Sequence, residues 1–106
     1  MVSFKDFQDL ELVVAQIIEV KEHPNADKLY VLKIDTGKEE KQIVAGIKNA
    51  YAKEALLGRK IIVVNNLEPV VLRGEESNGM LLAASDDNGP SILSPDRNVK
   101  IGSKVK

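Results

Sequence analysis

The chain has 106 residues, of which 43% are hydrophobic and 29% are charged, a balance that is typical of a folded globular protein. This length predicts one domain over residues 1–106, because each half alone would bury too small a core. The absence of cysteine excludes disulfides, thiolate metal sites and cysteine catalysis. No apolar run approaches about 20 residues, and the first ten residues lack the order of a signal peptide. We therefore expect a cytoplasmic protein with no membrane segment.

The formal net charge of −1 does not by itself indicate a nucleic-acid binder. Net charge averages over the whole surface, however, and a local basic stripe is what attracts phosphate. Basic residues form local groups at Arg59, Lys60, Lys100, Lys104 and Lys106. Any attraction for a polyanion should therefore be confined to patches of the surface.

Sequence patterns predict a short helix and then three strands in the first half of the chain. Ser3 with Asp6 three residues later resembles a capping box, and Phe4 and Phe7 fall on one face of the helix that it starts. The three strands are rich in Val and Ile and cover Leu12–Val20, Leu29–Asp35 and Gln42–Ala45. His23-Pro24 ends the first of them, because the residue before a proline favours extended backbone in a turn.

The second half of the chain predicts one more helix and three more strands. Its alanines, lysines and leucines favour helix over Ile47–Leu57, and Gly58 stands where a helix C-cap belongs. The further strands are predicted over Lys60–Asn65, Gly79–Ala84 and Val99–Val105. The stretch Ser85–Pro95 is rich in turn residues and predicts one surface loop.

This order of elements predicts an all-β fold. It fits a five-stranded OB-fold barrel with a short helix between strands 3 and 4 and with C-terminal extension strands. A ferredoxin-like sandwich would need two long helices, and the sequence offers one.

No set of residues in the sequence predicts catalysis. His23 is the only histidine, it precedes a proline in a turn, and no serine has the sequence of a nucleophile elbow around it. No two histidines stand at metal spacing, and Gly74 and Gly79 do not form a phosphate-cradling loop that opens a helix. We therefore expect a protein that is not an enzyme and that has no metal site and no cofactor.

Two segments carry side chains suited to binding. The loop His23–Leu29 presents Asn25, whose amide both donates and accepts, and Lys28, whose ammonium can meet a phosphate. An Asx turn at Asn25 beside a solvated Lys28 is the alternative reading of this loop. The second segment is Asn66–Met80.

In the second segment, irregular stretches flanking strands carry the polar side chains Asn66, Arg73, Ser77 and Asn78. Met80 begins a strand, where it either packs in the core or stands at the rim and touches a base. No strand carries an aromatic pair two residues apart, so stacking of single-stranded bases is not expected. A nucleic-acid ligand would instead be a folded RNA read through phosphates and 2′-hydroxyls.

These segments resemble the tRNA-binding domain found at the C-terminus of methionyl-tRNA synthetases, in their beta subunits and in free-standing structure-specific tRNA-binding proteins. The resemblance rests on three stretches, which are His23–Lys33, Gln42–Ile47 and the pattern NLxPxxLxGxxSxGMxLA from Asn66 to Ala83. It covers nearly the whole chain, from Phe4 to Lys106. Val13 and Gln16 stand where the first strand of the family often carries cations, so no phosphate contact is expected there.

The resemblance implies an OB-fold barrel that grips the outer corner of tRNA, usually as a homodimer, beside an aminoacyl-tRNA synthetase, which we expect to be the methionyl enzyme. The tRNA-binding residues that it implies here are Asn25, Lys28, Arg73, Ser77 and Met80. The face of Phe4 and Phe7 and the strand Val99–Val105 are expected either to form the dimer contact or to cover the ends of the barrel. One related group is an export-related chaperone, so a chaperone or protein-interaction module on the same fold is the alternative function.

Overall fold

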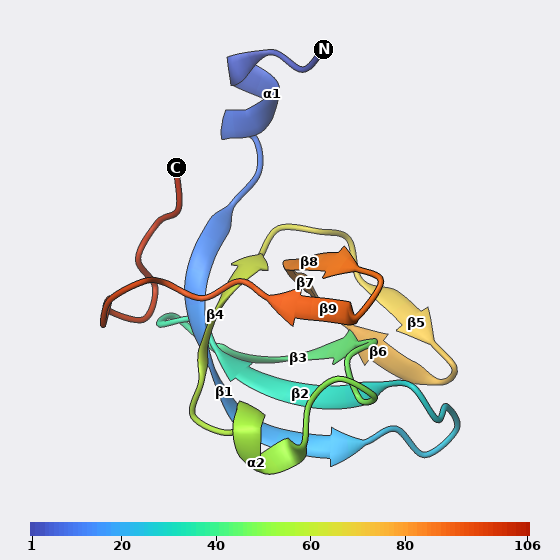
Figure 1. Cartoon of the computed structure of the whole chain (residues 1–106). Coiled ribbons are helices and arrows are strands. Elements are labelled where there is room, and N and C mark those ends of the chain that lie inside the picture. Colours follow the sequence, from blue (N-terminus) through green and yellow to red (C-terminus); the bar gives the residue numbers. More distant parts are fainter.

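The structure is a computed structural model that describes all 106 residues. It has two short helices, α1 (Phe4–Gln8) and α2 (Lys53–Leu56). Its strands are β1 (Leu12–Glu22), β2 (Tyr30–Asp35), β3 (Glu40–Ala45), β4 (Lys60–Val64), β5 (Val70–Leu72), β6 (Glu75–Ser77), β7 (Met80–Leu81), β8 (Ala83–Asp86) and β9 (Gly89–Ile92). The strands curl into a small barrel from which α1 stands apart (Figure 1). Neither helix is long and apolar enough to cross a membrane.

Five antiparallel strands in the order β3-β2-β1-β4-β7 form the main sheet. The long strand β1 belongs to both halves of this sheet. Its residues Leu12–Gln16 pair with β4, and its residues Gln16–Glu22 pair with β2. The register with β2 shifts between Ile17 and Glu19. A bulge of this kind bends a strand and increases its twist, and it lets one strand turn the corner between the two halves.

The free edge of β3 is covered by the segment that follows β6, and this contact closes the barrel. The backbone N–H of Asn78 donates to the carbonyl of Gln42 at 2.9 Å, and the side-chain amide of Gln42 donates to the carbonyl of Glu76 at 2.8 Å. A covered edge offers no unpaired strand to other chains. The predicted five-stranded barrel, with its helix between the third and fourth strands, is confirmed.

One cluster of 13 buried hydrophobic residues fills the barrel, and every strand of the main sheet contributes to it. The side chain of Leu56, which α2 carries, is fully buried and seals one end of the cluster. Tyr30 is also buried, and its hydroxyl donates to the carbonyl of Tyr51 at 2.7 Å. The alternation of apolar and polar residues along β2 is thus explained by one face that lines the core.

The helix predicted over Ile47–Leu57 is much shorter in the structure. Ile47 is buried in the core and is followed by a single turn, and the backbone at Ala52 is extended with φ −74° and ψ 152°. Helix α2 can therefore begin only at Lys53. The expected cap at Gly58 is confirmed, because its φ of 84° follows directly on the C-cap Leu57.

Three predictions for the last quarter of the chain are wrong in detail. The strand predicted over Gly79–Ala84 is divided between β7 in the main sheet and β8 in a separate hairpin, where Ala83 and Ala84 are exposed. The loop predicted over Ser85–Pro95 contains most of the β8–β9 hairpin.

The strand predicted over Val99–Val105 is also wrong, because the chain turns at Gly102 with a φ of 89°. What remains of this strand is one bridge between Lys104 and Val13. The carbonyl of Ser103 accepts from the N–H of Val14 at 2.9 Å, so the segment still lies against β1.

Candidate nucleic-acid interface

The hairpin of β5 and β6 projects from the barrel and ends in a turn at Arg73 and Gly74. The φ values of these residues are 54° and 93°, so both are left-handed, as in a type I′ turn. Arg73 is the one residue other than glycine with a positive φ. A non-glycine residue costs about 1–2 kcal/mol in this conformation, which asparagine bears better than arginine. The turn thus holds Arg73 at its tip in a backbone conformation that arginine disfavours.

His23 joins the loop His23–Leu29 to this hairpin. Its ring is 5% exposed, and Nε2 lies 2.8 Å from the carbonyl oxygen of Leu72. Its Nδ1 accepts a hydrogen bond from the backbone N–H of Asn25 at 2.9 Å. Because Nδ1 accepts, the proton of the neutral ring must be on Nε2, which donates to Leu72. The structural role expected for this histidine is therefore a link between two segments that are far apart in sequence.

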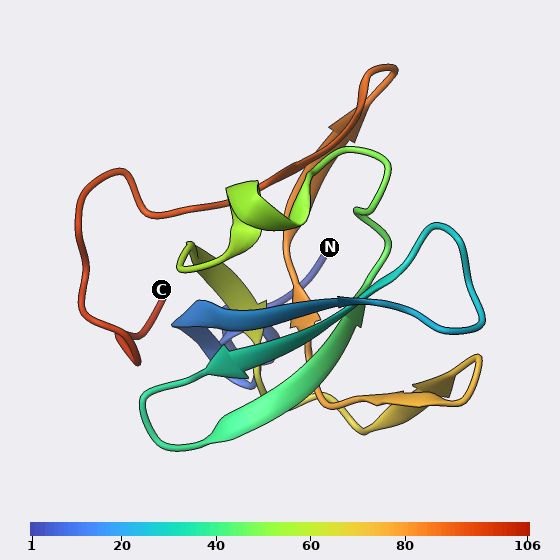
Figure 2. The same cartoon turned by 90° about the horizontal axis from the view of Figure 1, so that it is seen from below.

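The same contact brings Asn25 beside Arg73. The side-chain Nδ2 of Asn25 donates to the carbonyl of Arg73 at 3.3 Å, and no backbone N–H of the loop donates to its Oδ1, as an Asx turn would require. The loop and the hairpin lie side by side at one end of the barrel, to the right in Figures 1 and 2. The side chains of Lys28 and Arg73 are exposed and form no ion pair. Two free cations thus stand on adjacent loops.

Two other lysines near the loop share one carboxylate. Glu22, which directly precedes His23, lies 2.8 Å from the ammonium of Lys48 and 3.6 Å from that of Lys53. The hydrogen bond and charge of Lys48, with the charge of Lys53, lower the pKa of Glu22, and the hydrogen bond with Glu22 raises the pKa of Lys48. Lys28 and Arg73 differ from these two lysines because neither has a carboxylate partner.

Ser77 lies under the hairpin and is 3% exposed. Its hydroxyl accepts from the backbone N–H of Val44 at 2.9 Å and donates to the carbonyl of Gly79 at 3.0 Å. The bond with Val44 fixes the base of the hairpin to β3, and the bond with Gly79 fixes the turn that follows β6. The hydroxyl proton of Ser77 is therefore occupied inside the protein.

Met80 pairs with Val64 in the main sheet, and its side chain is 47% exposed, so it stands at the rim and not in the core. It borders a shallow apolar groove whose other lining residues are Val44, Ala45, Gly46, Ile47, Leu81, Leu82, Ala83 and Pro90. A Cβ atom on Gly46 would lie 3.6 Å from Cδ2 of Leu29, so the groove adjoins the loop that carries Lys28.

Sequence reasoning missed the strands β5 and β6, and it placed Arg73 and Ser77 on irregular segments. The signal was present, because β-branched Val70 and Val71 precede a two-residue turn that ends in glycine. No group of three or more His, Cys, Asp or Glu side chains could hold a metal ion.

A small five-stranded barrel that presents a polar loop beside a hairpin with an arginine at its tip has the architecture of the oligonucleotide-binding class. The family model described as "Putative tRNA binding domain" matches residues 12–104. The chain belongs to this tRNA-binding domain family.

Its relatives include aminoacyl-tRNA synthetases. The methionine–tRNA ligase of Pyrococcus horikoshii is 56% identical over 105 residues, which cover 99% of this chain and 14% of that ligase. The chain thus spans a small part of the length of the curated relatives that it matches.

Two solved structures have the same fold over the whole chain. The "MetRS related protein" of Pyrococcus horikoshii has a TM-score of 0.92 and 31% identity, and the match covers 100% of this chain and 98% of that one. The "CsaA chaperone protein" of Picrophilus torridus has a TM-score of 0.94 and 33% identity, with 100% of each chain covered.

Proposed function

We propose that this domain binds folded tRNA through the loop His23–Leu29 and the β5–β6 hairpin, as a non-catalytic accessory of an aminoacyl-tRNA synthetase, the methionyl enzyme. The observation that carries the proposal is the set of hydrogen bonds from His23 and Asn25, which fixes the two segments together and leaves Lys28 and Arg73 free. The similarity to methionine–tRNA ligases supports the choice of synthetase and a place in the cytoplasm.

In this proposal Lys28 and Arg73 neutralise phosphates, while the amide of Asn25 reaches a ribose hydroxyl or a base edge. Met80 adds an apolar contact at the rim. Ser77 acts from below by holding the hairpin to β3, since its hydroxyl is buried and bonded at both ends. Recognition is then of RNA shape, because the contacts involve the backbone and no pair of aromatic rings is available for stacking.

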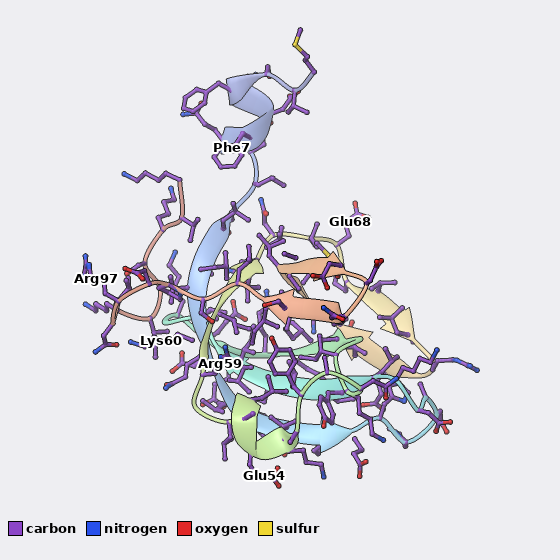
Figure 3. All side chains as sticks on the ribbon, in the orientation of Figure 1. Phe7, Glu54, Arg59, Lys60, Glu68 and Arg97 are labelled. Carbon is purple, nitrogen blue, oxygen red and sulfur yellow. The ribbon has the colours of Figure 1, made fainter.

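The helix α1 supports a homodimer as the working form. None of its residues is buried, and Phe4 and Phe7 are 73% and 38% exposed. The helix stands clear of the barrel with Phe7 at its side (Figure 3). Phe4, Phe7, Leu10 and Val105 border one hollow, whose lining also includes Gln8, Lys104 and Lys106, and these four apolar side chains offer a contact surface for a second copy. Two copies present two tRNA surfaces, and a linked second contact acts at an effective concentration on the order of millimolar.

The test of tRNA binding is a salt titration of affinity for folded tRNA, single-stranded RNA and duplex DNA. Affinity for folded tRNA should be highest and should fall steeply with salt. Lys28→Ala and Arg73→Ala should each weaken binding about tenfold and flatten the salt slope by about one unit. Lys33→Ala is the control, because Lys33 already pairs with Glu19 at 3.6 Å. Parent-like binding by both variants, or equal affinity for all three nucleic acids, would contradict the proposal.

The test of the dimer is sedimentation of the double variant Phe4→Ser/Phe7→Ser. It should be a folded monomer with the circular dichroism spectrum of the parent, because no residue of α1 is buried in the barrel. Val70→Ser/Val71→Ser removes an equally exposed apolar pair from the β5–β6 hairpin and should leave the dimer intact. A dimer that survives the α1 changes would reject this surface.

One observation favours a second function, that of an export-related chaperone or protein-interaction module. The apolar groove beside Met80 has the lining that an extended apolar peptide needs, and a structure with the same fold is a chaperone. Salt-insensitive binding of an unfolded protein, without a mobility shift of tRNA, would support this function over the first.

A further inference from the structure

The C-terminal segment is held against the turn between β2 and β3 by two glycines. A Cβ atom on Gly37 would lie 3.1 Å from Cα of Gly102, and one on Gly102 would lie 3.2 Å from the carbonyl oxygen of Thr36. Upstream, the ammonium of Lys60 donates to the side chain of Asn98 at 2.6 Å and to the carbonyl of Val99. Lys60 and Arg97 mark this side of the molecule in Figure 3. The segment is therefore fixed in place.

A polar cleft of about 490 Å³ lies between this segment, the β2–β3 turn and the ends of β1 and β4. Only Val13 and Ile101 among its lining residues are hydrophobic. Its charged lining consists of Lys38, Lys100 and Lys104 against Glu11 alone, which leaves an excess of two positive charges.

None of these three lysines takes part in an ion pair. The one carboxylate of the cleft, that of Glu11, accepts from the side-chain amide of Asn65 at 3.4 Å. Asn65 in turn accepts from the ammonium of Lys41 at 2.9 Å through its side chain. The carboxylate of Glu11 is thus bonded to Asn65, which also bonds Lys41. The three lysines of the cleft have no carboxylate partner.

Two residues of the lining also have backbone N–H groups that are unpaired within the chain. The N–H groups of Lys38 and Lys104 donate to no acceptor within the chain. Unpaired backbone N–H groups beside ammonium groups are the donors that proteins use to hold phosphate. Nine of the eleven lining residues are charged, polar or glycine, and the three lysines favour an anionic ligand.

We propose that this cleft is a second phosphate site, which binds the backbone of the same RNA at the end of the barrel opposite to the loop His23–Leu29. The proposal rests on the proposed function. The loop precedes β2 and the Gly37 turn follows it, so the six residues of β2 separate the two sites by about 20 Å. Figures 1 and 2 both place the two sites at opposite ends of this strand. An RNA bound at both ends would follow the length of the barrel.

The first test compares two triple variants with the same loss of charge. Lys38→Ala/Lys100→Ala/Lys104→Ala empties the cleft of ammonium groups, whereas Lys21→Ala/Lys33→Ala/Lys53→Ala removes lysines that already pair with glutamate. The cleft variant should bind folded tRNA at least about tenfold more weakly than the control variant, with a salt slope lower by about two to three units. All six positions are exposed, so both variants should keep the fold of the parent, which thermal unfolding checks.

The second test needs no RNA. In the full 106-residue chain, inorganic pyrophosphate should shift the amide NMR signals of Gly37 and Gly102, and these shifts should be absent in the cleft variant. If the parent binds tRNA but the two triple variants have equal salt slopes of tRNA affinity, the second site is overturned and the proposed function stands. A parent that binds no tRNA would reject the proposed function. If such a parent still shows pyrophosphate-induced NMR shifts at Gly37 and Gly102, the cleft binds free phosphate only, and the proposal that it binds an RNA backbone is overturned.

Discussion

The imidazole Nε2 of His23 lies 2.8 Å from the carbonyl oxygen of Leu72, across 49 positions of sequence. With Nδ1 accepting from the N–H of Asn25, this ring joins the two segments that carry Lys28 and Arg73. Because both ring nitrogens are engaged in one tautomer, the relative position of the two loops is fixed by a single side chain. The same link explains why a buried histidine stands in a turn that does no chemistry.

His23→Ala should therefore separate the two loops. It leaves the carbonyl of Leu72 and the N–H of Asn25 without their partner in the chain and opens a cavity, which costs about 2–3 kcal/mol of unfolding free energy. Urea unfolding measures this cost, and hydrogen exchange at Asn25 should become faster than in the parent. Asn25→Ala is the control, since it removes an exposed bond of 3.3 Å and should cost less than about 1 kcal/mol. Unchanged exchange at Asn25 in the histidine variant would show that the ring is not the link.

Arg73→Asn should make the protein more stable and a weaker RNA binder at once. Asparagine accepts the φ of 54° more readily than arginine does, so we expect a gain of about 0.5–1 kcal/mol in unfolding free energy. The guanidinium is lost in the same change, so tRNA affinity should fall about tenfold. Thermal unfolding and a tRNA titration on one sample measure both effects. If the variant is more stable and binds tRNA as the parent does, the strained conformation of Arg73 does not serve RNA binding.

Ser77→Ala should act on stability first. It removes the acceptor of the buried N–H of Val44, at a cost of about 1–3 kcal/mol. At temperatures well below unfolding, the variant should keep most of the tRNA affinity of the parent, because the hydroxyl faces β3. Chemical denaturation and a tRNA titration separate the two effects. A large loss of affinity with unchanged stability would instead give Ser77 a direct contact with RNA.

The barrel could be predicted because its strands carry their own signals. Runs rich in β-branched residues define β1, β2 and β3, and the order of strands and helix allows few other folds. The C-terminal segment could not be predicted, since its alternating Val99, Ile101 and Val105 read as a strand. Its actual path depends on the contact of Gly102 with Gly37, which has no local signal.

The candidate site could be predicted only as a set of residue types. Asn25, Lys28 and Arg73 were recognisable as polar side chains in loops, but their adjacency arises from the hydrogen bond between His23 and Leu72. The buried hydroxyl of Ser77 also depends on tertiary structure, because β3 supplies the N–H that it accepts. Pairings between distant segments are fixed by the whole fold, so a reading of short windows misses them.

The ion pair of Glu22 and Lys48 should make stability depend on pH at both extremes. Lys48 lowers the pKa of Glu22 below its usual 4.5, so this contribution is present above that pH and is lost as the pH falls through the lowered value. Glu22 raises the pKa of Lys48 above 10.5, so the contribution is also lost as the pH rises through the raised value. Glu22→Gln should therefore destabilise the protein at pH 7 and match the parent at pH 2. Urea unfolding across pH 2–7 checks this, and an equal difference at both pH values would contradict it.

Gly37→Ala should loosen the C-terminal segment from the barrel. The new methyl group would meet Cα of Gly102 and the carbonyl oxygen of Ile101 at 3.1 Å, both backbone atoms that cannot move aside without shifting the segment. Gly89→Ala is the matched control, because its φ of 106° carries a similar backbone strain and nothing lies within 4 Å of the added Cβ. Both variants should lose about 1 kcal/mol from strain, and Gly37→Ala should lose about 1–2 kcal/mol more from the clash. Hydrogen exchange should rise at Val14 and Val105 in Gly37→Ala alone, since these N–H groups pair with carbonyls across the bridge. Equal losses and equal exchange in the two variants would mean that the contact of the glycines does not hold the segment, and the cleft that it borders would lose its fixed shape.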